Sequence, residues 1–208
     1  MNSDSSFRKK RRESAIEHLL DAAESVIARV GYDSVTMAEI AEAAGCATGT
    51  LYLYFRDKQQ LVTALVERHG RRFRERIVKA MEETPDPLEK LRRAALSFLD
   101  YFSRNRNYFK VLYASNLFRR GVLPGSLPPG ELEERKRFQS MTLEVIRQAQ
   151  ARGQIRSDFP PEEIAGFMRA YMVGMLDQLS LLETLPTAEA LMRAIWAFMT
   201  GGMAAREA

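Results

Sequence analysis

Helical periodicity along nearly the whole chain is the feature that most limits what these 208 residues can fold into. From Ser14 to Val30 the apolar residues recur at positions i, i+3, i+4 and i+7, which is the spacing of an amphipathic helix. Similar stripes follow, separated by glycine and proline. A lone strand among helices would leave its backbone groups without partners. The sequence therefore predicts an all-α protein of about nine helices, with a break in composition near residues 80–87.

Capping-box pairs and glycines predict where the first helices begin and end. In such a pair, the side chain of the first residue and that of a residue three positions later satisfy each other's free N–H groups. The pairs are Ser14 with Glu17, Thr36 with Glu39, and the similar Asp57 with Gln60. Gly31 and Gly45 predict the ends of the first two helices.

The segment TGTLYLYF, residues 48–55, has the composition of a strand but lies between helices. Because a strand here would have no partner, we predict a short helix from Thr48 to Tyr54, the second half of a helix-turn-helix. Leu51 and Phe55 lie four residues apart, so both should face inward and hold this helix on the first one.

Composition and charge narrow the class of protein. A chain that is 46% hydrophobic with a net charge of +4 is globular, and its single cysteine excludes an internal disulfide. No apolar run is long enough for a signal peptide or a membrane span, so we expect a soluble, cytoplasmic protein. The run Arg8–Arg12 and residues 58–79 are basic, whereas residues 13–57 are acidic. A nucleic acid would be attracted by the two basic regions.

Residues 36–69, TMAEIAEAAGCATGTLYLYFRDKQQLVTALVERH, carry a specific combination of motifs. The combination comprises Thr36, Ile40-Ala41, Gly45 at the turn, Thr50-Leu51-Tyr52, Tyr54-Phe55, Lys58 and Leu61. This segment closely resembles the DNA-binding segment of TetR-type transcriptional regulators, over about residues 10–70. The rest of the chain is similar only in its helix count and in GQIRSDFPPEEIAGFM, at the entry to the penultimate helix.

The resemblance implies a recognition helix in the major groove, with its first residues on base edges. Thr48 and Thr50 can hydrogen-bond to bases and touch thymine methyl groups, and Gly49 lets the backbone approach DNA closely. Thr36 and Lys58 lie at helix N-termini, where free N–H groups favour a phosphate. The residues expected at DNA are Thr36, Cys46, Thr48, Gly49, Thr50, Tyr52, Tyr54 and Lys58.

Alternatives remain for some of these residues. The Tyr54 ring could pack inward, and Thr50 and Tyr52 could be ordinary surface residues. Cys46, in the turn, fits a small buried hydrophobe better than a redox sensor. The recognition helix lacks Arg, Asn and Gln, so specificity should depend on Thr and Tyr contacts, on DNA shape and on the basic tail in a minor groove.

A division into residues 1–57 and 58–208 follows, with DNA binding in the first part and ligand binding and dimerisation in the second. The penultimate helix is apolar nearly all round, and the last helix adds further apolar residues. Together they have more apolar surface than one core readily absorbs, which predicts a homodimer through these two helices. The family resemblance implies the same arrangement, and a two-fold dimer would place two recognition helices on successive turns of one face of DNA.

A ligand cavity is the second expected site. In the family such a cavity holds an inducer between the two domains, and an apolar or aromatic ligand fits these residue types best. Plain core packing is the alternative for each residue. The candidates are Phe98, Phe102, Tyr108, Phe109, Tyr113, Met141 and Met172.

The chemistry of an enzyme is not evident. His18 and His69 are expected to be solvated, and no metal cluster, cofactor loop or nucleophile-base arrangement stands out. The sequence thus predicts a sequence-specific transcriptional regulator, a ligand-relieved repressor that binds a palindromic operator as a homodimer, without a cofactor. The alternatives are a helical hydrophobe-binding protein or enzyme with a vestigial helix-turn-helix, and a non-selective DNA binder.

Overall fold

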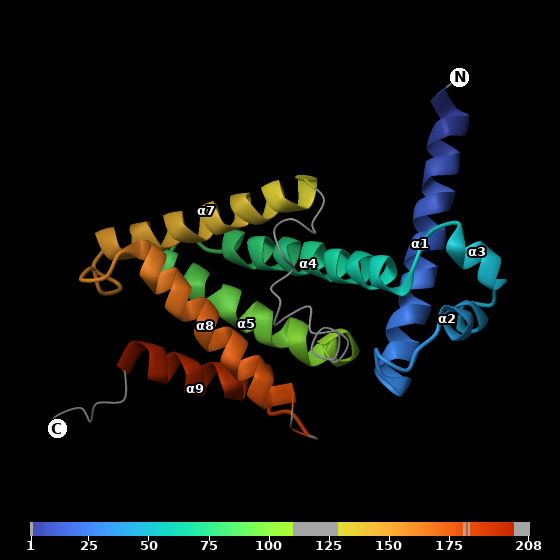
Figure 1. Ribbon diagram of the computed structural model, residues 1–208. Coiled ribbons are helices and arrows are strands. Elements are labelled where there is room, and N and C mark those ends of the chain that lie inside the picture. The colour runs from blue at the N-terminus through green and yellow to red at the C-terminus, as the bar shows by residue number, and fades with distance from the viewer. Residues whose placement is uncertain (1, 110–128, 181, 183, 202–208) are drawn as a thin grey trace. The chain divides into compact units, whose positions relative to one another are not determined.

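The computed structural model describes residues 2–109, 129–180, 182 and 184–201. In these residues it contains helices and connecting turns and no strand, which confirms the all-α prediction. The helices, labelled in Figure 1, are α1 (Asn2–Val30), α2 (Met37–Ala43), α3 (Thr48–Tyr52), α4 (Lys58–Glu82), α5 (Pro87–Arg104), α7 (Pro129–Ala151), α8 (Pro161–Ser180) and α9 (Ala188–Gly201). Residues 106–109 are helical as well.

The described residues divide into two compact units. The N-terminal unit holds residues 2–70 and 107–109, and the C-terminal unit holds residues 71–106 and those from 129 onward. The units part after Gly70, inside α4. The domain boundary expected between residues 57 and 58 lies where α4 begins.

The first helix begins earlier than its sequence signal indicates. α1 starts at Asn2 and includes the basic run Arg8–Arg12, so Ser14 lies inside the helix and the prediction that it caps the helix with Glu17 is wrong. Lys and Arg are good helix formers, and no glycine or proline interrupts residues 2–30. Gly31, at φ +89°, ends the helix as predicted.

The turn between α2 and α3 follows the predicted signals. Thr36 and Glu39 form the predicted capping box at the start of α2, and Gly45, at φ +65°, follows its end. α3 ends at Tyr52, two residues earlier than predicted. α2 packs against both α1 and α3.

The start of α4 is a modified capping box. The Asp57 carboxylate accepts from the N–H of Gln60 at 2.8 Å, as predicted. The Gln60 side chain returns to the N–H of Arg56, at 2.6 Å, one residue before the expected partner.

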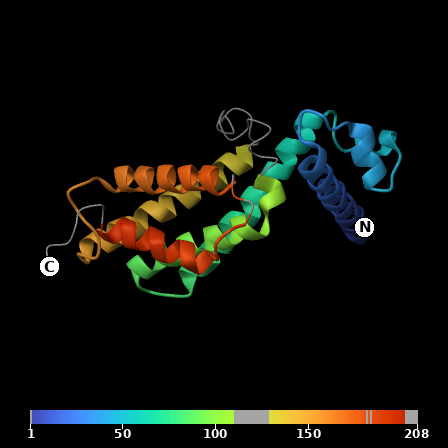
Figure 2. The ribbon, with the colours of Figure 1, turned by 90° about the horizontal axis from the view of Figure 1, so that it is seen from below.

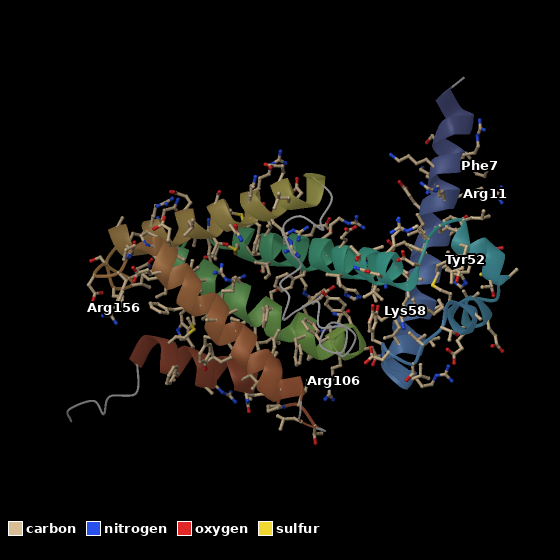
Figure 3. The ribbon with its side chains drawn as sticks, viewed as in Figure 1. Phe7, Arg11, Tyr52, Lys58, Arg106 and Arg156 are labelled. Atoms are coloured by element: carbon tan, nitrogen blue, oxygen red, sulfur yellow. The ribbon has the colours of Figure 1, made fainter. Side chains whose placement is uncertain are left out.

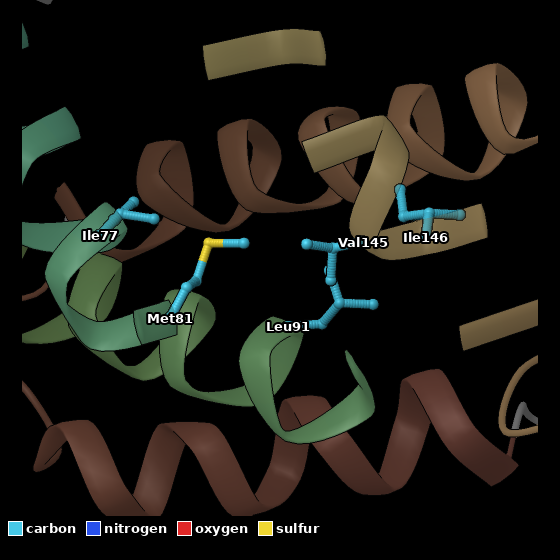
Figure 4. Packing of buried hydrophobic residues seen from close by; sticks show 5 residues of the cluster. All are labelled: Ile77, Met81, Leu91, Val145 and Ile146. Carbon is cyan, nitrogen blue, oxygen red and sulfur yellow. The ribbon is translucent and has the colours of Figure 1, made fainter. Parts of the chain in front are cut away.

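The C-terminal unit is a bundle in which α5 packs against α7 and α9, and α7 packs against α8, as Figure 2 shows from below. One core cluster joins α4, α5 and α7 (Figure 4), where Met81 and Val145 point toward each other. Its members are Ile77, Met81, Leu91, Val145 and Ile146. A second cluster joins α5 to α9 through Ala95, Leu99, Met192 and Ile195.

Candidate nucleic-acid interface and ligand cavity

The segment from α3 to Phe55 has one buried face and one exposed face. Leu51 is 0% exposed and Phe55 4%, so the inward pair of the predicted recognition helix is confirmed. Tyr52 is 52% exposed and appears on α3 in Figure 3. Gly49 and Thr50 are also exposed. The scaffold therefore fixes this short helix by its apolar side and leaves a polar edge accessible.

The other recognition-segment candidates are less accessible. Thr48 and Tyr54 are half-buried, and Cys46 is half-buried in the turn, where its N–H donates to the Ala41 carbonyl at 2.9 Å. The sequence did not single out Leu53, which is 79% exposed beside Tyr52. Leu53 alternates with the tyrosines as it would in a strand, where it would share a face with Leu51 and Phe55. In a helix it lies outside that apolar face.

Gly49 is not required by contacts within its own chain. A Cβ atom added at this position would meet no atom within 4 Å, and the backbone is not in the left-handed region. A glycine inside a helix costs about 1 kcal/mol relative to alanine. Either the position tolerates this cost by chance, or something outside the chain approaches it closely.

Thr36 is exposed, but its polar groups are engaged in the capping box. Its hydroxyl accepts from the N–H of Glu39 at 3.2 Å, and its own N–H donates to the Glu39 carboxylate at 2.8 Å. The backbone N–H of Thr36, followed by its hydroxyl, lowers the pKa of Glu39. A carboxylate therefore already occupies the N-terminus of α2, where a phosphate was expected.

Lys58 uses its ammonium inside the N-terminal unit. The Nζ atom donates to the carbonyls of Tyr32 at 2.7 Å, Val35 at 3.1 Å and Asp33 at 3.3 Å. It also lies 4.8 Å from the centre of the Tyr32 ring. The side chain, marked in Figure 3, thereby ties the loop before α2 to the start of α4.

A charged cluster that no local sequence pattern predicts joins α1 to α4. Arg68 is 2% exposed and its guanidinium pairs with Asp21 at 2.6 Å, Glu24 at 3.0 Å and Glu17 at 3.4 Å. Arg68 therefore neutralises acidic residues of α1 instead of adding to the basic surface expected over residues 58–79.

His69 belongs to the same cluster, so the expectation that it is solvated is wrong. It is 2% exposed, its Nε2 lies 2.9 Å from the Glu24 carboxylate, and its ring stacks on Tyr108 at 3.9 Å between centres. The charged neighbours of His69 in the sequence concealed a contact with a residue 45 positions away. His18 remains exposed and bonds to the Ala44 carbonyl.

The basic run Arg8–Arg12 lies on α1 with its side chains exposed. An α-helix with side chains is about 10–12 Å across, and the minor groove of B-DNA is about 6 Å wide. A helical run does not fit that groove, so the expectation of a tail in the minor groove is replaced by a basic helix surface.

A cavity of about 480 Å³ lies in the C-terminal unit. Phe98 and Met172 line it as expected, together with Phe73 of α4, Phe138 of α7 and Trp196 of α9, which the sequence did not single out. The complete lining is Phe73, Ile77, Met81, Leu91, Ala94, Ala95, Phe98, Phe138, Gln139, Thr142, Leu143, Glu162, Ala165, Met168, Arg169, Met172, Trp196 and Met199.

The other ligand candidates lie elsewhere. Phe102 and Met141 belong to the C-terminal unit but are not in the cavity lining. Tyr108 and Phe109 are buried in the N-terminal unit, and Tyr113 lies outside the described residues. Aromatic and methionine content identified the right region, but the cavity is assembled from five helices whose packing the sequence does not reveal.

An exposed apolar face lies on α8 and α9. Phe167 is 62% exposed, Phe198 42% and Met199 37%. Phe198 stacks on Tyr171 of α8 at 5.7 Å between ring centres, which joins the two helices. Among the described residues, no group of three or more His, Cys, Asp or Glu side chains is arranged to hold a metal ion.

Residues 19–65 match the profile described as bacterial regulatory proteins, tetR family, and this range contains α2, α3 and the exposed edge around Tyr52. This segment is a TetR-family DNA-binding segment. TetR proteins are regulators and not enzymes. In the part of the chain that the structure describes, no helix is long and apolar enough to cross a membrane.

Some similar proteins cover only the N-terminal part of the chain, and others cover both units. An HTH-type transcriptional regulator of Mycobacterium tuberculosis is 40% identical over 39% of this chain and 41% of its own length, so the match spans about two fifths of that relative. The HTH-type transcriptional repressor BepR of Brucella suis is 27% identical over 78% of each chain. The structure of the regulator FadR of Bacillus subtilis in complex with stearoyl-CoA is 19% identical, with a TM-score of 0.71 over 90% of this chain and 99% of that one. This last likeness shows the fold.

Proposed function

We propose that this TetR protein is a cytoplasmic transcriptional repressor that binds a palindromic double-stranded DNA operator as a homodimer and is released by a small apolar ligand. The observation that carries the proposal is the exposed edge Gly49, Thr50 and Tyr52 on a helix whose Leu51 is fully buried. The similarity to the repressor BepR supports the repressor mode.

Gly49→Ala separates DNA contact from folding. Alanine is the better helix former and its Cβ meets nothing within 4 Å in this chain, so the variant should be slightly more stable than the parent. If DNA approaches the backbone here, the same methyl group should weaken operator binding at least tenfold. Ser140→Ala, at an exposed position of α7, is the control: it should also raise stability slightly, because alanine is the better helix former there too, and should leave operator binding unchanged.

The operator for this assay comes from genomic fragments that the protein retains, and mobility shifts at one fixed salt concentration measure affinity. Tyr52→Ala and Thr50→Ala should reduce binding to the operator far more than binding to unrelated DNA. Equal losses on both DNAs, with little preference between them in the parent, would favour a non-selective DNA binder.

The dimer is argued from the apolar face of α8 and α9. Phe167 and Phe198 are exposed, and large exposed apolar patches mark interaction sites. Gly174, also on α8, is exposed, and a Cβ there would meet no atom within 4 Å of this chain, so its backbone is open to a second helix. Two copies of the pair would form a four-helix interface.

Sedimentation measures the dimer directly. Phe167→Glu should shift the protein to monomers and abolish cooperative operator binding, whereas Lys136→Glu, an exposed change on α7, should leave the dimer intact. A monomeric parent protein at assay concentrations would contradict the proposal.

Release by ligand is argued from α4. The second half of α4 places Phe73, Ile77 and Met81 at the cavity, and its first half carries Arg68 in the contact with α1. A ligand that prefers one position of α4 would change the spacing of two recognition helices, and this works only through a difference in affinity between the two states. The stearoyl-CoA complex of FadR supports a ligand that contains a long apolar chain.

A further inference from the structure

The polar groups at the cavity differ in whether they are already paired. The Thr142 hydroxyl donates to the Phe138 carbonyl at 3.0 Å, and the Glu162 carboxylate accepts from Arg147 at 2.8 Å. Arg147 also lies 3.9 Å from Glu144. Thr142 and Glu162 are thus each already paired within the bundle, so an incoming ligand gains little from them.

Arg169 is the exception among the charged residues of this lining. It lies on α8, next to Met168 and one turn before Met172, which also line the cavity. Its side chain is exposed, and in the part of the chain that the structure describes it has no ion pair. A long arginine side chain can place its stem against apolar surface and its guanidinium in water. Among the described residues, Arg169 therefore puts a positive charge without an ion-pair partner at a mostly apolar cavity.

We propose that the cavity binds an amphiphile whose apolar body lies among Phe98, Met168 and Trp196 and whose anionic head pairs with Arg169. A carboxylate and a phosphate both match the planar fork of a guanidinium. The cavity volume of about 480 Å³ falls within the range of small-molecule sites. The inference rests on the proposed ligand-relieved repressor and specifies the chemical class of its ligand.

The protein contains its own reporter for this binding. Trp196 is the only tryptophan of the chain, is half-buried and lines the cavity. Filling the cavity should change its fluorescence, so affinity can be measured without DNA. Calorimetry on the full-length protein gives the same constant independently.

The test compares ligands that share one alkyl chain and differ in the head. The probes are dodecanoate, dodecyl phosphate, dodecanol and dodecyltrimethylammonium, each below its micelle concentration. At least one of the anions should bind about tenfold or more tightly than the alcohol, since only an anion can form a charge-assisted hydrogen bond with the guanidinium. The cation should bind most weakly. The stronger of the two anions identifies the head group.

Arg169→Gln should remove the preference for the anion and leave the affinity for dodecanol within twofold. Arg193→Gln is the matched control, because Arg193 is also exposed and lines a separate hollow of about 340 Å³ beside the same tryptophan. Unaltered thermal unfolding shows that both variants fold. Equal affinity for anion and alcohol in the parent, or a loss in Arg193→Gln and not in Arg169→Gln, would overturn the inference.

Operator release is measured separately from ligand binding. An anion that binds through Arg169 without affecting the DNA complex would leave the binding site intact and contradict the proposed repressor mechanism. No binding of any probe, with normal operator binding, would contradict the ligand class alone.

Discussion

Each of the two units has an apolar core, but the units differ in where their charged side chains lie and in how their helices pack. In the N-terminal unit, two basic side chains bind groups that are distant in the sequence. Lys58 donates to three carbonyls, and Arg68 pairs with three carboxylates. In the C-terminal unit, apolar side chains pack between helices and enclose a cavity of about 480 Å³. The first unit therefore adds buried charged contacts to its apolar core, and the apolar side chains of the second surround a cavity.

This difference fits the two tasks proposed for the protein, which make opposite demands on packing. Reading base edges requires side chains held in one geometry, and hydrogen bonds and ion pairs provide fixed directions. Accepting a ligand requires a cavity, and methionine and aromatic residues tolerate changes of shape around one. Each of the following variants tests whether the two units differ in this way.

Leu51→Ala should have the largest effect. Leu51 is 0% exposed, so the truncation leaves a hole and should lower the free energy of unfolding by about 3 kcal/mol. Leu53→Ala, at a 79% exposed position nearby, should change it by less than about 0.5 kcal/mol. Met172→Ala, at the existing cavity, should cost less than half as much as Leu51→Ala. Denaturant unfolding measures the free energy of unfolding of all three variants. Equal losses in Leu51→Ala and Met172→Ala would contradict the proposed difference in packing between the two units.

Arg68→Met should have the next largest effect. The change keeps the stem but leaves Glu24, which is only 18% exposed, beside His69 without its arginine. We expect a loss of about 2 kcal/mol, below the range for fully buried pairs because Asp21 is 69% exposed. Arg56→Met, whose side chain is 87% exposed, is the control and should not change stability measurably. If Arg68→Met left the free energy of unfolding unchanged, apolar packing alone would join α1 to α4.

The sequence predicted features that depend on near neighbours in the chain, and it missed contacts between residues that are far apart in the chain. The glycine ends, the Thr36–Glu39 box and the inward pair Leu51 and Phe55 depend on neighbours within a few residues, and all are confirmed. The partners of Arg68 lie 44 to 51 residues away, so no local pattern announced their contact.

The same reason explains the cavity. Phe98 and Met172 were predicted from their residue types, but Phe73 and Trp196 join them only because α4 and α9 pack beside α5 and α8. The unexpected start of α1 has a different cause, since a serine that suits a helix N-terminus is also tolerated within a helix when nothing interrupts the residues before it.

Lys58→Met should have a moderate effect on stability and a small one on DNA electrostatics. Removing the ammonium leaves carbonyls of the loop before α2 without their donor, which should cost about 1 kcal/mol. Because the ammonium is already engaged, the dependence of operator affinity on salt should keep its slope. A slope lower by about 1 would instead show a phosphate contact by Lys58.

The smallest effect concerns pH, and here the two units should behave alike. The N–H of Thr36 lowers the pKa of Glu39 below its ordinary value of 4.5, and the N–H of Glu89, followed by Gln154, lowers the pKa of Asp86 below 3.8. A depressed folded-state pKa means that each cap stabilises its helix at neutral pH and loses this effect as the pH falls through the folded value.

Glu39→Ala and Asp86→Ala should therefore lower the melting temperature at pH 7, and both differences from the parent should shrink below the ordinary pKa of each group. Glu42→Ala, an exposed change on the same helix as Glu39, is the control and should show no such convergence. Thermal melts across the acidic range measure this. If the melting temperatures of variant and parent converged for Glu39→Ala alone, loss of a cap in acid would weaken only the N-terminal unit. The two units would then differ in their helix caps as well as in their long-range contacts.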